Sequence, residues 1–182
     1  MNQPNTSLIY VTAFLAVLGE ASLPGFRYWL GAQVDLLPAL MVYTALHTNL
    51  TQVACLAVLG GLWFDSLSAN PLGITILPLF AVGFVIFLKR DLILRDLTFA
   101  QIILGAAASA LVPFLSVMMM LSAGQSLLLG WGSLWQWLVL TAGGGGATPL
   151  LFALFRSFNQ AFGYKVRTES SFRPDREIRR SR

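Results

Sequence analysis

Long apolar runs separated by short polar stretches dominate this chain of 182 residues. A helix rises about 1.5 Å per residue, so it needs ~20 apolar residues to cross a hydrocarbon core of about 30 Å. The last two runs meet this length easily. The second and third are too short, unless they tilt or form a hairpin that does not cross completely. Six runs are recognisable: Leu8–Phe26, Leu36–Leu46, Leu50–Phe64, Ile74–Leu88, Phe99–Leu121 and Leu134–Phe158.

Composition supports a membrane protein. Hydrophobic residues make up 56% of the chain and charged residues 11%, whereas soluble domains contain about 25% charged residues. A water-soluble fold of this size could not bury so much apolar surface. The sequence therefore predicts an all-α polytopic bundle of about six transmembrane helices.

Candidate chemistry is sparse along the chain. One cysteine and one histidine rule out a disulfide framework and give no cluster at metal-ligand spacing. The glycine run Gly143–Gly146 lacks the Lys-Ser/Thr that follows a phosphate-binding loop. We expect no catalytic residue, no cofactor and no metal site, and hence no enzyme.

Lysine and arginine positions predict the orientation. Of twelve such residues, Lys89, Arg90 and Arg95 lie between the fourth and fifth runs, and eight more lie from Arg156 onward. Only Arg27 lies in a connection on the other side of the membrane. Because basic loops favour the cytoplasmic side, we expect both termini in the cytoplasm.

The chain divides into a transmembrane helical domain, residues 1–165, and a basic tail, residues 166–182. The tail is polar and rich in arginine, so we expect it to be disordered and to lie near anionic membrane lipids. Basic tails are normal on the cytoplasmic side of membrane proteins, so we do not expect nucleic acid as a partner.

Three charged residues form a possible polar cluster in the outer half of the bundle: Glu20, Arg27 and Asp35. Glu20 lies inside the first apolar run, and an ionisable residue in a span is a functional hypothesis by default. It could instead pair with Arg27 or with a polar group on a neighbouring helix.

Asp65 marks the junction of the third and fourth runs. The small and polar residues that follow it, with Pro71 and Gly73, predict a turn. Its carboxylate could cap backbone N–H groups of that turn, pair with Arg27, or contact a partner or ligand.

The pattern from Gly61 to Asp65, followed by Pro71 and Leu-Gly at Gly73, resembles the rod shape-determining protein family MreD. That family shows Gly-Leu, two apolar residues, Asp, a stretch of small residues and then Leu-Gly. The matching part runs from about Leu36 to Leu88.

The resemblance implies a non-catalytic protein of the bacterial inner membrane that acts in cell elongation. The implied partner is MreC, together with RodA, a penicillin-binding transpeptidase and, indirectly, the MreB filament. The implied fold is similar to the substrate-binding subunits of energy-coupling-factor transporters. The motif residues Gly61, Asp65, Pro71 and Gly73 would be structural or partner-binding.

Two alternatives stay open. The chain could be a vitamin-binding subunit of an energy-coupling-factor transporter, with Glu20, Arg27, Asp35 and Asp65 lining an outer pocket. Separately, Gly143–Gly146 could dock another membrane protein or pack inside the bundle, because small residues let membrane helices approach closely.

Overall fold

The computed structural model describes residues 6–22, 35–68, 71–93, 97–124 and 130–162. All regular secondary structure within these ranges is α-helical. The helices are α1 (Thr6–Ser22), α3 (Leu37–His47), α4 (Leu50–Leu67), α5 (Ile76–Lys89), α6 (Thr98–Ser122) and α7 (Trp131–Phe162).

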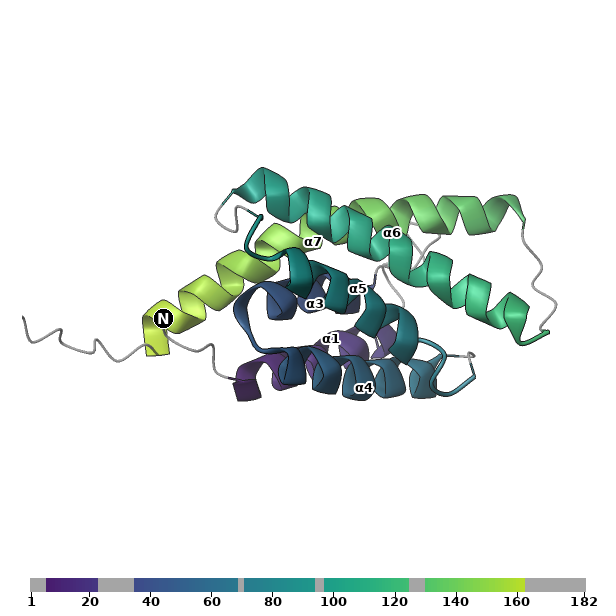
Figure 1. Cartoon of the computed structure of the whole chain (residues 1–182), viewed down its shortest axis with the longest axis horizontal. Helices are drawn as coiled ribbons and strands as arrows, with labels where there is room; N and C mark the ends of the chain where they lie inside the picture. Colours follow the sequence, from purple (N-terminus) through teal and green to yellow (C-terminus); the bar gives the residue numbers. More distant parts are fainter. Residues whose placement is uncertain (1–5, 23–34, 69–70, 94–96, 125–129, 163–182) are drawn as a thin grey trace, which may run out of the picture.

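Consecutive helices run back and forth between two ends of the molecule (Figure 1). We call them the Asp65 end, which holds the α4–α5 turn, and the Arg90 end, which holds the α3–α4 and α5–α6 connections. α6 and α7 lie together along one side, α1 and α4 lie on the opposite side, and α3 and α5 lie between them.

Helix α3 is the centre of the bundle. It contacts the other five described helices, and every residue from Leu37 to Leu46 is buried. A helix that is apolar on all sides needs such surroundings, and an apolar stretch of 10–14 residues is more typical of a core helix than of a span. The second apolar run is therefore the internal core of the fold.

Three described helices are long and apolar enough to cross a membrane: α4, α6 and the part of α7 from Trp131 to Phe158. The apolar parts of α1, α3 and α5 are shorter than 18 residues. The structure thus supports a helical membrane protein but not a bundle of six full-length spans. The third run, expected to be too short, is a candidate span because α4 continues beyond Phe64 to Leu67.

Glycines bring α6 and α7 close together. A Cβ at Gly105 would lie 2.6 Å from the carbonyl oxygen of Gly144 and would also collide with Thr148, while a Cβ at Gly144 would collide with Ser109. Gly146, in contrast, is exposed and has open space around it. The middle of the glycine run therefore serves internal packing, the second of its two expected roles.

Several predictions concern residues outside the described ranges. They include Arg27 with its possible ion pairs, Arg95, the end of the first apolar run beyond Ser22, and the basic tail from residue 166.

Candidate functional site

The Asp65 carboxylate binds the start of α5. Its Oδ2 accepts hydrogen bonds from the backbone N–H of Gly73 at 2.9 Å and of Thr75 at 3.1 Å. Its Oδ1 accepts one from the Thr75 hydroxyl at 2.5 Å. Asp65 is only 1% exposed, so these three donors replace water around a buried charge, as a buried carboxylate requires. The turn-capping role expected for Asp65 is present.

Gly73 and Pro71 shape the same turn. Gly73 has φ +90°, a left-handed conformation that glycine adopts without steric cost. The carbonyl oxygen of Pro71 accepts a hydrogen bond from Ile74 N–H at 3.3 Å. This bent backbone aims the Gly73 and Thr75 N–H groups at one carboxylate oxygen of Asp65.

Two adjacent glycines on α4 let two helices begin against it. A Cβ at Gly61 would lie 3.1 Å from both the backbone N and Cα of Ile76, the first residue of α5. A Cβ at Gly60 would lie 2.9 Å from Cδ1 of Leu37, the first residue of α3. A side chain at Gly61 would push the start of α5 away from α4, whereas one at Gly60 would meet only the Leu37 side chain.

Glu20 and Asp35 bind the start of α3 in the same manner. Glu20 Oε1 accepts a hydrogen bond from Leu36 N–H at 2.6 Å, and Asp35 Oδ1 accepts one from Leu37 N–H at 2.8 Å. The structure thus brings together two members of the expected polar cluster, while Arg27 lies outside the described residues. The second oxygen, Glu20 Oε2, is buried without a hydrogen-bond partner within the described part of the chain.

All three acidic side chains therefore accept backbone hydrogen bonds at or just before a helix start. The first N–H groups of a helix lack partners within it and carry a partial positive charge. Asp65 serves α5, and Glu20 with Asp35 serves α3. Burial would otherwise leave these N–H groups unsatisfied.

Sequence reasoning missed Thr75. It precedes α5 but makes no side-chain cap to its own helix, because its hydroxyl donates to Asp65 instead. A threonine just before an apolar helix indicates a residue that caps a helix start. The sequence does not indicate that its hydroxyl binds Asp65, ten residues earlier.

Among the described residues, no group of three or more His, Cys, Asp and Glu side chains could hold a metal ion. A groove of about 370 Å³ lies between the first turns of α5 and the last turns of α6. Its walls are apolar, formed by side chains such as Leu77, Leu115 and Met118. The polar groups of the Asp65 turn do not line it.

The geometry of the Asp65 end is that of a structural junction: three helices meet, and carboxylates hold two of their starts. No protein-family model, curated protein or solved structure matches the chain.

Proposed function

We propose that this chain is a non-enzymatic scaffold of the bacterial inner membrane, of the MreD type, that binds MreC. In this role it supports cell-shape maintenance and lateral peptidoglycan synthesis beside RodA and a penicillin-binding transpeptidase, with MreB as an indirect partner. The proposal includes the finer topology, with both termini cytoplasmic and the Asp65 end facing outward.

The observation that supports the proposal is that Gly61, Asp65, Pro71 and Gly73 all shape the junction of α4 and α5. Both oxygens of Asp65 accept hydrogen bonds from this chain. Gly61 gives room for α5, and Gly73 supplies the bent backbone. A motif whose groups hold one turn in shape fits a protein that presents a fixed surface to a partner.

The first turns of α7 are the candidate surface for that partner. All residues from Trp131 to Leu138 are exposed, and Trp137 Nε1 ties this segment to α6 by donating a hydrogen bond to the carbonyl oxygen of Ala110 at 3.0 Å. Leu134 is 53% exposed and Leu138 is 61% exposed. In lipid, helices associate by van der Waals packing, and a single apolar helix such as the membrane anchor of MreC could supply it.

Co-purification tests this proposal. The tagged full-length chain is expressed with MreC and extracted in a mild detergent, and we expect MreC to be retained. Replacing both Leu134 and Leu138 with alanine should reduce retention about tenfold, the equivalent of ~1.4 kcal/mol of lost contact.

A matched control is Leu150→Ala with Leu154→Ala, at exposed sites further along α7. These changes should leave MreC retention as it is. Failure of the unmodified chain to retain MreC would remove the proposal, and equal loss in both double variants would remove the assignment of the surface.

The vitamin-transporter alternative has one feature in its favour, the buried Glu20 Oε2, which has no hydrogen-bond partner among the described residues. A thermal-shift screen of the purified chain against vitamins tests it. Saturable stabilisation at micromolar vitamin would contradict a role limited to scaffolding.

A further inference from the structure

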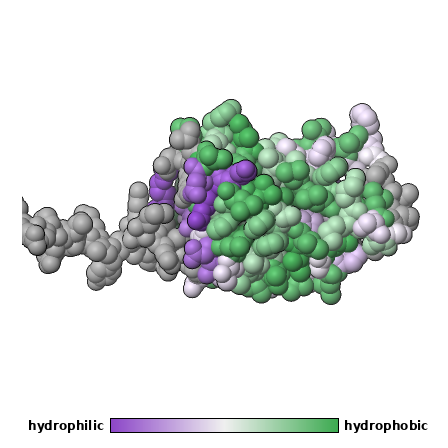
Figure 2. Space-filling model, in the orientation of Figure 1, coloured by the Kyte–Doolittle hydropathy of each residue, from purple (hydrophilic) through white to green (hydrophobic). Residues whose placement is uncertain are grey.

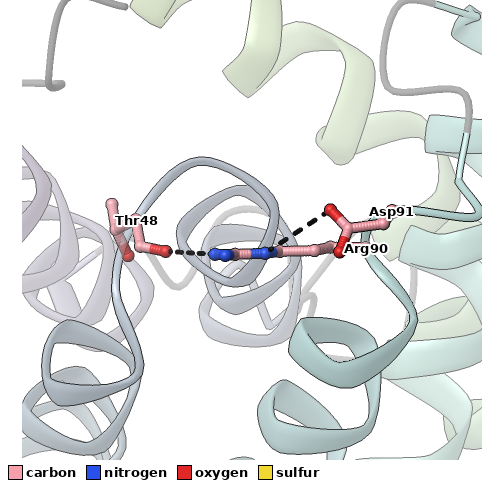
Figure 3. Close-up of polar contacts among 3 residues, drawn as sticks. All are labelled: Thr48, Arg90 and Asp91. Carbon is pink, nitrogen blue, oxygen red and sulfur yellow. Dashed lines mark hydrogen bonds and ion pairs between the residues drawn. The ribbon is translucent and has the colours of Figure 1, made fainter.

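Arg90 is held in place at the end of α5. Its Nη1 donates a hydrogen bond to the backbone carbonyl of Thr48 at 3.1 Å, and its Nε lies 3.9 Å from Oδ1 of Asp91 (Figure 3). The guanidinium carbon lies 4.2 Å from the centre of the Phe87 ring. The cation therefore bridges α5 and the α3–α4 turn, and a planar guanidinium carries several N–H donors that suit the geometry of an oxyanion.

Further basic side chains lie at this end of the molecule. Lys89 is exposed beside Arg90. Arg156 is exposed on α7 one turn after Phe152, whose ring lies 5.3 Å from the ring of His47, the residue before Thr48. Figure 2 shows hydrophilic residues gathered at the same end, directly next to the apolar body of the bundle.

Apolar side chains flank the two cations. Leu88 is 60% exposed and Leu92 is 80% exposed. A soluble anion would gain nothing from them, whereas an acyl chain that covers the two leucines removes apolar surface from water, which is favourable. Basic and apolar side chains side by side are typical of surfaces that lie in the headgroup layer of a membrane.

We propose that the turn from Leu88 to Leu92 is a binding site for an anionic phospholipid. Lys89 and Arg90 bind the phosphate of the headgroup, and Leu88 and Leu92 contact its acyl chains. The site fixes the depth of the α5–α6 connection in the membrane. It does not depend on the proposed scaffold function.

Thermal unfolding of the purified full-length chain in detergent tests this site. Increasing phosphatidylglycerol should raise the midpoint saturably, since a ligand that binds only the folded state stabilises it. Phosphatidylcholine and inorganic phosphate at the same concentrations should have little effect. The shift should shrink as salt is added, because exposed charges are screened.

Variants separate the site from general stability. Lys89→Gln changes an exposed side chain and should weaken the apparent affinity for phosphatidylglycerol about fivefold. Leu92→Ser should weaken it as well, whereas the matched control Asp91→Asn, which removes a nearby negative charge, should leave it equal or tighter.

Arg90→Gln also breaks the contact with Thr48, so its unfolding midpoint without lipid should fall. The lipid-dependent shift of this variant is therefore measured from its own lipid-free midpoint. An equal response to phosphatidylcholine, or unchanged affinity in both Lys89→Gln and Leu92→Ser, would overturn the proposal. An equal response to inorganic phosphate would replace the lipid site with a site for soluble anions.

Discussion

Asp65 shows how a single side chain can hold two helices together. It is nearly fully buried, and its partners come from residues eight and ten positions later in the chain. A buried charge with three donors is stable only while all of them stay in place. The residue therefore couples the end of α4 to the start of α5.

Replacing Asp65 with asparagine tests this coupling. The amide keeps one acceptor but turns an N–H₂ group toward the donors of Gly73 and Thr75. We expect a loss of about 1–3 kcal/mol in the free energy of unfolding, measured by denaturant or thermal unfolding in detergent. Asp91→Asn, at a side chain that is 84% exposed, should change it by less than ~0.5 kcal/mol. A stable Asp65→Asn protein that no longer retains MreC would assign the carboxylate to the partner interface.

The adjacent glycines of α4 offer a second residue-level test. Gly61→Ala places its methyl group against the backbone of Ile76, which cannot move without shifting α5, so we expect a loss of about 1–3 kcal/mol from overpacking. Gly60→Ala meets only the end of the Leu37 side chain, and about 1 kcal/mol of improved helix propensity offsets that contact. Unfolding experiments on the pair should find Gly61→Ala clearly less stable, and equal effects would contradict the close approach.

At the scale of elements, run length separates spans from core helices only in part. The run at Leu36–Leu46 is too short for a full span, and it forms α3, which the other described helices enclose. The run at Leu50–Phe64 looked similar, yet α4 extends to Leu67 because Asp65 is satisfied within the fold and does not end the helix. Hydropathy reports which residues avoid water, and it does not say whether lipid or protein surrounds them.

The packing of α6 on α7 gives an element-level prediction. Gly105→Ala would place a methyl group against the backbone of Gly144. We expect a loss of about 1–3 kcal/mol, visible as a lower unfolding midpoint in detergent. Gly146→Ala lies in open space within the same glycine run and should be neutral or gain up to about 1 kcal/mol from helix propensity. Equal destabilisation by both changes would mean that backbone flexibility, and not the contact, explains the glycines.

For the whole molecule, the sequence predicted an all-helical membrane bundle and the turn at Asp65, since both follow from local patterns. It did not predict which groups Glu20 and Asp35 bind. Their partners are backbone N–H groups at Leu36 and Leu37, and every residue type except proline has such a donor, so no side-chain pattern marks them. The contact between Arg90 and the Thr48 carbonyl is hidden for the same reason.

The topology of the whole molecule depends on whether α5 crosses the membrane. Its 14 residues extend for only about 21 Å, less than a hydrocarbon core of about 30 Å, so crossing would require a locally thinned bilayer. Single cysteines at Ser66 and at Asp91, exposed positions before and after α5, test this in a Cys55→Ala background. With an impermeant thiol reagent on spheroplasts, Ser66→Cys should react at once and Asp91→Cys only after permeabilisation. The reverse labelling pattern would show the opposite orientation, with the Asp65 end facing the cytoplasm. Reaction of both from one side would show that α5 returns without crossing, so that the Asp65 turn and the Arg90 end share a leaflet.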